Sequence, residues 1–316
     1  MTSKDISLDI MKQLLALSAT KKGISKPNPV VAAAVVKDGG IISTGVHDTP
    51  GTPHAEVLAL KAAGSLSKGS TLYVTLEPCT HFGKTPPCVD AIIHSGVQKV
   101  VYAVDDPNPK VRKKPAIDIL SQHGIQVESG VLSQDAMFMN EVYFVNQLKS
   151  RPHVTLKVAM SLDNKIATIP DQKTYLTSES SLKHVHQVRR EVCCLLVGVG
   201  TVLSDNPSLD VRYDLLSSEH KNPTIVILDD ALKTPPNSIL FHKKFSRRVI
   251  IFTSDTLDFA THPLVQCADI IPVSKDSNGL SLSHILDVLY QRGMTSVLVE
   301  GGQRVFTSAM KEGFVD

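Results

Sequence analysis

The spacing of apolar residues in the first half of the chain alternates between helical and strand patterns. Apolar side chains recur every three or four positions over residues 6–19 and predict an amphipathic helix. Two apolar runs flank Asp38-Gly39-Gly40, which is typical of a β-hairpin. The same pattern, followed along the chain, predicts strands at 30–36, 41–46, 71–76, 99–104 and 125–128, and helices at 88–94, 115–123 and 133–147. Strands that alternate with helices indicate a largely parallel sheet covered on both faces.

A further helix is predicted between the hairpin and the next strand. Thr52 is the expected N-cap and Pro53 the expected first helical residue, and an apolar stripe continues to Gly64. His54 and Glu56 would then lie in the first helical turn.

The pattern begins again after a polar linker at 146–152 that ends in Arg-Pro. Strands are predicted at 153–161, 193–199, 223–228, 248–252, 269–273 and 295–299, and helices at 179–190, 281–291 and 303–311. A chain of 316 residues is long enough for two domains of ordinary size, each with its own core. We therefore expect α/β domains at 1–147 and 152–316.

Composition excludes several classes of function. The net charge is only +2 and aromatic residues make up 5% of the chain, so a nucleic-acid partner is not expected. The sequence has no apolar run near the roughly 20 residues that span a bilayer and no signal-peptide core, which indicates a cytoplasmic protein without a membrane partner. The five cysteines do not form a secreted disulfide pattern. Cys193, Cys194 and Cys267 are interpreted as reduced core residues in strands.

The candidate chemistry lies between His54 and Cys88. One imidazole and two thiolates, from His54, Cys79 and Cys88, can hold Zn²⁺ and leave a fourth position open for water. Glu56, which is not a ligand in this scheme, would be the catalytic proton carrier in a hydrolytic deamination. Cys79 follows a predicted strand, and Cys88 begins a predicted helix, where a thiolate is favoured. The alternative is an ordinary core histidine with two buried free cysteines.

The run from Thr75 to Cys88, Thr-Leu-Glu-Pro-Cys-Thr-His-Phe-Gly-Lys-Thr-Pro-Pro-Cys, resembles the bifunctional deaminase/reductase family of riboflavin biosynthesis, RibD/RibG. Eight residues separate Cys79 from Cys88, whereas cytidine and tRNA-adenosine deaminases usually have two between the paired cysteines. The resemblance implies a cytidine-deaminase-like α/β/α sandwich followed by a dihydrofolate-reductase-like α/β domain. It also implies deaminase substrate contacts at Asn28, His47, Lys84, Asp106 and Asn108. From the residues alone, turn or strand-end roles are equally open at Asn28, His47, Asp106 and Asn108, and a solvated loop lysine is the preferred interpretation of Lys84.

The second half carries no His/Cys/carboxylate cluster with metal spacing, but it has two glycine turns, Gly198-Val-Gly-Thr201 and Glu300-Gly-Gly302. Such turns before a helix can bind phosphate, although a plain tight strand-to-helix turn is the more common explanation. The resemblance implies an NADPH-dependent reductase. By motif match, it assigns cofactor contacts to Ala159, Tyr175, Thr201, Asp205 and Gly302, and substrate contacts to Arg189, Leu209, Arg212 and Glu300. The arginines are suited to a bidentate grip on the substrate 5′-phosphate.

Several departures from the family pattern affect the reductase half, among them Asn164 for Gly, and Glu179 and Leu182 for the usual Pro and Arg. Tyr175 stands where the family usually has Trp, and family members continue beyond the position of Asp316. We therefore expect the second domain to lack its usual C-terminal strands.

The resemblance implies a small-molecule substrate, 2,5-diamino-6-(5-phosphoribosylamino)pyrimidin-4-one. This substrate would be deaminated and then reduced from ribosyl to ribityl with NADPH. We also expect a homo-oligomer, a dimer or a tetramer. Three alternatives stay open: a deaminase with an inactive reductase lobe, a nucleoside or tRNA deaminase, and a nonenzymatic scaffold in which zinc is structural. In the last case a protein ligand, for which His81 is the nearest candidate, would close the fourth zinc position.

Overall fold

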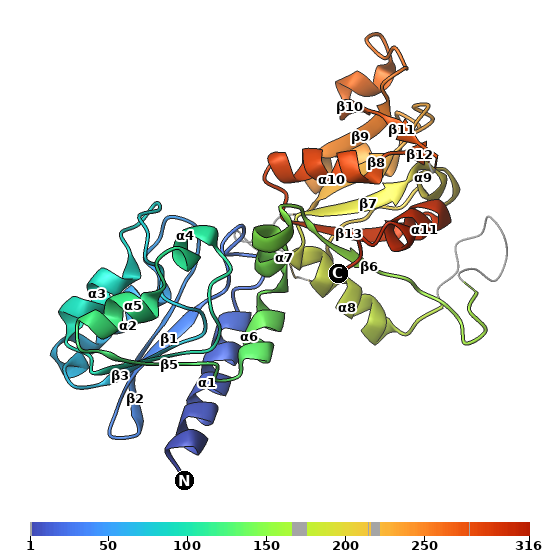
Figure 1. The fold of residues 1–316 in the computed structure, drawn as a ribbon. Coiled ribbons are helices and arrows are strands. Elements are labelled where there is room, and N and C mark those ends of the chain that lie inside the picture. The colour runs from blue at the N-terminus through green and yellow to red at the C-terminus, as the bar shows by residue number, and fades with distance from the viewer. Residues whose placement is uncertain (1, 166–175, 214, 216–221, 278) are drawn as a thin grey trace. The chain divides into compact units, whose positions relative to one another are not determined.

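The computed structural model describes residues 2–165, 176–213, 215, 222–277 and 279–316. Contacts divide the chain into two compact units, Met1–Lys149 and Ser150–Asp316. Each unit is a sheet covered by helices (Figure 1).

The first unit contains a five-stranded sheet in the order β2-β1-β3-β4-β5. Strand β1 is antiparallel to β2 and β3, whereas β3, β4 and β5 are parallel. The strands are β1 (Ala32–Lys37), β2 (Gly40–Val46), β3 (Thr71–Val74), β4 (Lys99–Tyr102) and β5 (Gln126–Ser129). The pattern of apolar runs predicted all five, and the predicted hairpin is confirmed as β1 and β2.

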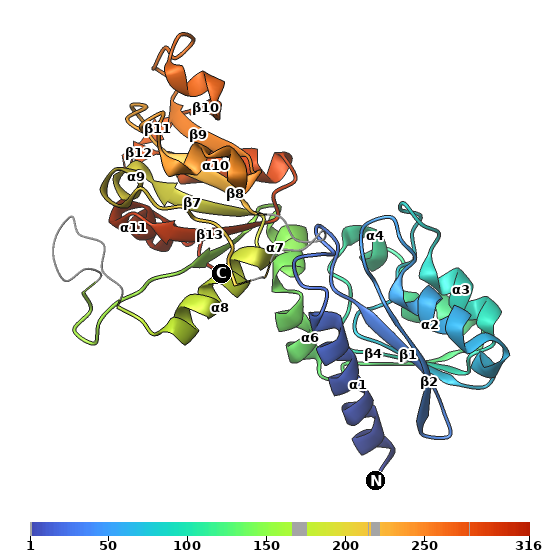
Figure 2. The ribbon, with the colours of Figure 1, turned by 180° about the vertical axis from the view of Figure 1, so that it is seen from behind.

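Helices cover both faces of this sheet, as the two opposite views show (Figures 1 and 2). One face carries α2 (Ala55–Ala63), α3 (Cys88–Ser95) and α5 (Ala116–Gln122), and the other carries α1 (Ser3–Ala19) and α6 (Ser133–Met139). The remaining helical segments are η1 (Gly64–Ser67), α4 (Pro109–Arg112) and α7 (Glu141–Lys149). Residues 32–36 of β1 are all buried because both faces of that strand are covered.

Two predicted helix boundaries in this unit are wrong. Helix α2 begins at Ala55 with His54 as its N-cap, because the Thr52 hydroxyl donates to Thr49 O at 2.7 Å and closes a separate turn. The predicted helix 133–147 is two helices, α6 and α7, which meet at Asn140. The Asn140 side chain accepts from Val30 N at 2.8 Å and donates to Val30 O at 3.1 Å, so this residue ties the helix junction to the segment before β1.

The second unit contains a six-stranded parallel sheet in the order β10-β9-β8-β7-β13-β6. Its strands are β6 (His153–Leu156), β7 (Cys194–Gly198), β8 (Thr224–Leu228), β9 (Val249–Ser254), β10 (Asp269–Val273) and β13 (Ser296–Gly301), and a small hairpin adds β11 (Lys275–Asp276) and β12 (Gly279–Leu280). The helices are α8 (Glu179–Glu191), α9 (Val199–Asp205), α10 (Leu282–Gln291) and α11 (Gln303–Lys311), with short turns η2 (Ile239–Phe241), η3 (Lys243–Phe245) and η4 (Pro263–Gln266).

Alternate residues of the central strands enter two separate cores. Cys194 and Leu196 of β7 pack with apolar residues of α10 and α11. Leu195 and Val197 pack on the opposite face with residues of α9 and the loops that follow it. The two-residue period of a strand therefore places α10 and α11 on one face and α9 on the other.

Three expectations for the second unit are corrected. The predicted strand 153–161 ends at Leu156, because its pairing with β13 stops opposite Val299. Directly after Val299, the register between β13 and β7 becomes irregular. Cys193 precedes β7, and Cys267 follows η4, so only Cys194 of the three lies in a strand. None of the five cysteines, all of which the structure describes, is in a disulfide bond.

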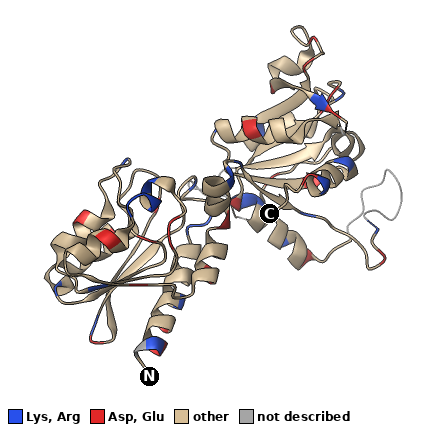
Figure 3. Ribbon diagram, viewed as in Figure 1, with Lys and Arg blue, Asp and Glu red and all other residues tan. Residues whose placement is uncertain are grey.

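Charged residues of both signs are interspersed over the described parts of both units (Figure 3). Within the described residues, no helix is both long and apolar enough to cross a bilayer.

Candidate functional site

Sheet topology brings four separate segments to one edge of the first sheet. Because β3 and β4 are parallel neighbours, the segments that follow them leave at the same edge. Strand β1 is antiparallel to β3, so it begins at this edge, and β2 ends there. Asn28 precedes β1, His47 follows β2, Cys79 follows β3 and Asp106 follows β4. The carboxyl ends of parallel strands are where open α/β sheets place their sites.

The three predicted metal ligands meet at this edge. The ligand atoms of His54, Cys79 and Cys88 all lie within 4.8 Å of one another. His54 Nδ1 is 3.2 Å from Cys88 Sγ and 3.5 Å from Cys79 Sγ. The other ring nitrogen, Nε2, lies 3.2 Å from Thr85 Oγ1, a contact that helps to fix the orientation of the imidazole.

This geometry fits zinc. Tetrahedral Zn²⁺, with Zn–N of about 2.0–2.1 Å and Zn–S of about 2.3 Å, places its nitrogen and sulfur ligands roughly 3.5 Å apart. A hydrogen bond from Cys88 lowers the pKa of the Cys79 thiol, and the same contact, with burial, raises the pKa of Cys88. A nearby cation would favour a second thiolate at this place. Among the described residues the ligand group has three members, and His81 is not one of them. Three protein ligands are typical of catalytic zinc sites, whereas structural sites have four.

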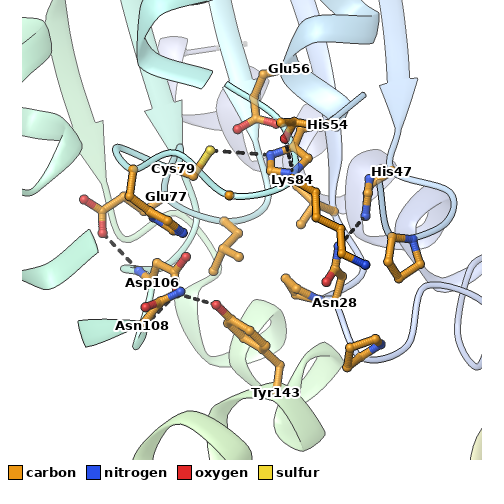
Figure 4. A pocket seen from close by; sticks show the side chains of 18 of the residues that line it. Asn28, His47, His54, Glu56, Glu77, Cys79, Lys84, Asp106, Asn108 and Tyr143 are labelled. Atoms are coloured by element: carbon orange, nitrogen blue, oxygen red, sulfur yellow. Dashed lines mark hydrogen bonds between the residues drawn. The ribbon is translucent and has the colours of Figure 1, made fainter. Parts of the chain in front are cut away.

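Glu56 lies beside the ligand group without belonging to it. It is in the first turn of α2, the residue is only 3% exposed, and it lines the same cavity as His54 and Cys79 (Figure 4). Burial, with a smaller effect of the negative Cys79, raises the pKa of Glu56 to about 7. A carboxyl group with these properties can both accept and release a proton.

The cavity has a volume of about 360 Å³, and all five predicted substrate residues line it. Asn28 Nδ2 donates to His47 Nε2 at 3.0 Å, and His47 Nδ1 lies 3.4 Å from Pro53 O. Burial lowers the pKa of His47, which favours the neutral ring that this pairing requires. Lys84 extends from the loop between the two cysteines toward Asn28 and His47 (Figure 4).

Asp106 and Asn108 form the opposite wall and are held by further residues. Asp106 is buried, and burial raises its pKa. Its backbone N–H donates to Glu77 Oε2 at 3.0 Å, and its Oδ1 accepts from Asn108 N at 2.8 Å and from the Tyr143 hydroxyl at 2.9 Å. Glu77 and Tyr143 also line the cavity but were not predicted. Glu77 lies directly before Pro78-Cys79, which is a signal in the sequence, whereas nothing in the sequence marks Tyr143.

The two glycine turns of the second unit come together in space. They follow neighbouring strands, β7 and β13, and open α9 and α11. A Cβ built on Gly302, which has φ +100°, would lie 3.4 Å from Gly198 N, and one built on Gly301 would lie 2.7 Å from Thr201 Cγ2. Glycine is favoured at Gly302 by its positive φ and the close approach of the Gly198 backbone, and at Gly301 by the close approach of the Thr201 side chain. Thr201 and Gly302 therefore lie close together, as contact with the same cofactor would require.

The predicted substrate residues of the second unit also converge. Arg189 Nε donates to Glu300 Oε1 at 2.5 Å and its Nη2 to Glu300 Oε2 at 2.7 Å, while Nη1 donates to Asp210 O at 3.0 Å. Arg212 Nε lies 3.1 Å from both carboxylate oxygens of Asp210. Leu209 is buried in the same loop with φ +46°. Both arginines are thus paired with acceptors from the protein, so a phosphate would have to compete for them.

The structure also shows where two of the other predicted cofactor residues lie. Ala159 follows β6, the neighbour of β13, and Asp205 is the last residue of α9, where its Oδ1 accepts from the Ser204 hydroxyl at 2.8 Å. Tyr175 lies outside the described residues.

Family models match both units. Residues 7–104 match the cytidine and deoxycytidylate deaminase zinc-binding region, and residues 152–316 match the RibD C-terminal domain. The riboflavin biosynthesis protein RibD of Aquifex aeolicus is 41% identical over 313 residues, 99% of this chain and 85% of the relative. The chain belongs to the RibD family.

Other RibD proteins support the same assignment. RibD of Bacillus amyloliquefaciens is 39% identical over 97% of this chain and 81% of its own length. The crystal structure of a diaminohydroxyphosphoribosylaminopyrimidine deaminase/5-amino-6-(5-phosphoribosylamino)uracil reductase from Thermotoga maritima matches with a TM-score of 0.85 and 38% identity, over 98% of this chain and 85% of that one. Acinetobacter baumannii RibD matches with a TM-score of 0.86 and 31% identity, over 99% and 85%. The expected fold class, a deaminase-like α/β unit followed by a RibD reductase unit, is confirmed. Membership of the family makes the chain a zinc-dependent deaminase and an NADPH-dependent reductase of riboflavin biosynthesis.

Proposed function

We propose that residues 1–147 deaminate a diamino-hydroxy-phosphoribosylaminopyrimidine and that residues 152–316 reduce the resulting 5-amino-6-(5-phosphoribosylamino)uracil with NADPH. These are the reactions named for the Thermotoga maritima relative. One observation carries the deaminase half: a group of one histidine and two cysteines, with a buried carboxyl group beside it in the same cavity. Three ligands favour catalysis over a purely structural role for the metal.

In this proposal His54, Cys79 and Cys88 hold the zinc, which when bound activates water for attack on the pyrimidine ring. Glu56 is the catalytic residue. Its carboxyl group first moves one proton of the water to the ring nitrogen. It then moves the second proton, from the hydroxyl group left on the ring carbon, to the departing ammonia. Its burial keeps bulk water away from the transferred proton. This deamination consumes one water and releases one ammonia, and it needs no oxidant or reductant.

The remaining cavity residues bind the substrate. Asn28, His47 and Lys84 lie on one side of the cavity, and Asp106 and Asn108 lie on the other (Figure 4). Carboxylate and amide oxygens on the second side are acceptors, which suits ribose hydroxyls and exocyclic amino groups. The eight-residue loop between the cysteines supplies Lys84, so a shorter loop of the nucleoside-deaminase type would not supply this amine.

For the reductase we propose cofactor contacts at Ala159, Tyr175, Thr201, Asp205 and Gly302. The first N–H groups of a helix lack intrahelical partners and bind phosphate, so the start of α11 after Gly302 fits a phosphate of NADPH. NADPH supplies the hydride, and the protein positions the substrate against it. Arg189, Leu209, Arg212 and Glu300 are the proposed substrate contacts. The Arg212 side chain is 55% exposed and that of Arg189 12%, so Arg212 is the more accessible phosphate ligand.

Ammonia release from the diaminopyrimidine ribotide by zinc-loaded protein tests the deaminase. Glu56→Gln and Glu56→Ala should retain zinc and lose roughly 10²–10⁴-fold in rate, the usual cost of a lost general acid/base. Glu128→Gln is the matched control, because Glu128 pairs with Lys99 at the surface. Unreduced turnover in both Glu56 variants would refute the role of this residue. Preference for cytidine over the ribotide would favour a nucleoside deaminase.

Oxidation of NADPH with the deaminated ribotide tests the second half. If the protein deaminates the ribotide but does not bind NADPH, it is a deaminase with an inactive reductase lobe. We further propose a cytoplasmic location. The lack of disulfide bonds among the five described cysteines supports it, since thiols persist in reducing compartments. The homo-oligomer stays a prediction that light scattering can test.

A further inference from the structure

Tyr143 enters the deaminase cavity from α7, an element that the zinc signature does not contain. Its hydroxyl donates to Asp106 Oδ1 at 2.9 Å (Figure 4). The same oxygen accepts from Asn108 N at 2.8 Å. Among the residues that the structure describes, these two donors both bond Oδ1, and Oδ2 accepts from neither. One oxygen of the buried carboxylate is thus held by the protein, and the other takes no part in these two hydrogen bonds.

The backbone on either side of Asp106 is fixed as well. Asp106 N donates to Glu77 Oε2 at 3.0 Å, and Ala116 N donates to Glu77 Oε1 at 2.8 Å. With the backbone held by Glu77, the remaining freedom of Asp106 is the rotation of its side chain. The Tyr143 hydroxyl restrains that rotation.

The helix that carries Tyr143, α7, is itself held in place at its start. Helix α7 starts one residue after Asn140, whose side-chain amide pairs with both backbone groups of Val30, at 2.8 and 3.1 Å. Val30 follows the segment that carries Asn28, another cavity residue. Burial, and then the Asp106 carboxylate, raise the pKa of Tyr143, so its hydroxyl remains a donor.

We propose that Tyr143 is a positioning residue of the deaminase, which holds Asp106 so that Oδ2 accepts a hydrogen bond from a hydroxyl or amino group of the substrate. This inference rests on the proposed deamination of the ribotide. Tyr143 does not touch the reacting atoms in this scheme. Because the contact to the substrate is the same before and during the reaction, its loss should raise KM and leave kcat nearly unchanged.

The test is steady-state ammonia release by Tyr143→Phe, which removes only the hydroxyl. We expect KM to rise roughly 3- to 10-fold, as for the loss of one hydrogen bond of ordinary net strength, with kcat within about twofold of wild type and zinc content unchanged. Tyr73→Phe is the matched control. Its hydroxyl lies 2.9 Å from Ser7 Oγ in the same unit, away from the cavity, so its removal should leave KM unchanged.

A double-mutant cycle separates positioning from a general loss of packing. Once Asp106→Asn has removed the carboxylate, adding Tyr143→Phe should change KM by less than about twofold. Additive effects, or an unchanged KM in Tyr143→Phe, would overturn the inference while wild-type deamination stands. If wild-type protein released no ammonia from the ribotide, the proposed function itself would fail and this inference with it.

Discussion

Replacement of Gly45 by alanine should displace the helix that carries the catalytic glutamate. Gly45 is a buried residue of β2, and α2 crosses directly over it. A Cβ at this position would lie 2.3 Å from Ala55 O, 2.6 Å from Ala59 N and 2.8 Å from Leu58 Cβ. Two of these are backbone atoms, so no change of rotamer can relieve the clash. The helix has to move.

The required movement gives the expected magnitude. A carbon and a carbonyl oxygen come no closer than about 3.3 Å in ordinary contacts, so α2 must shift by about 1 Å from β2. Overpacking of this kind costs about 1–3 kcal/mol of unfolding free energy. In a unit of this size each kcal/mol corresponds to roughly 2–4 °C, which gives a fall in Tm of roughly 2–12 °C. A displacement of 1 Å near the reacting groups can lower the rate by about 100-fold.

The assay combines calorimetry, zinc analysis and ammonia release on the same preparations. Gly40→Ala is the control, because Gly40 lies in the same strand and its added Cβ would meet only Lys37 O, at 3.7 Å. We expect the Gly45 variant to lose stability in the transition of the first unit and to lose deaminase activity, while the Gly40 variant stays close to wild type. Equal Tm values and equal rates for the two variants would show that α2 does not depend on this close approach.

Two predictions concern the second unit. Burial opposes the charge of Asp210, but hydrogen bonds, chiefly from Arg212, outweigh it and lower its pKa to about 2. The pKa of Asp210 is lower in the folded than in the unfolded protein, so its carboxylate stabilises the fold above about pH 4, and this contribution disappears as the pH falls toward 2. Urea unfolding at pH 6 should therefore show Asp210→Asn to be less stable than wild type by about 1 kcal/mol or less. Near pH 2 the two proteins should not differ. Gly301→Ala should cost about 1–3 kcal/mol and weaken NADPH binding, because the new Cβ would lie 2.7 Å from Thr201 Oγ1. Gly200→Ala, which meets nothing within 4 Å, is the control for stability, and equal urea midpoints would contradict the clash.

Periodicity predicted the helices and strands well where the local pattern is strong and less well where tertiary contacts set the boundary. The parallel strands of the second unit are continuous apolar runs, because both of their faces are buried, so they can be identified from the sequence. The break between α6 and α7 was missed. It depends on the pairing of Asn140 with Val30, 110 positions away, and no local pattern records such a contact.

The sequence by itself determined the kinds of chemistry available to this protein. The types and spacing of His54, Glu56, Cys79 and Cys88 indicate a zinc-dependent deaminase, because ligand chemistry depends on the side chains themselves. Only the tertiary structure decided which residues surround that chemistry. The order and direction of the strands bring Asn28 and Asp106 to one edge, and the path of α7 adds Tyr143 to the same cavity. These neighbours are distant in sequence, so their proximity follows from packing of the whole unit and not from any local preference of the chain.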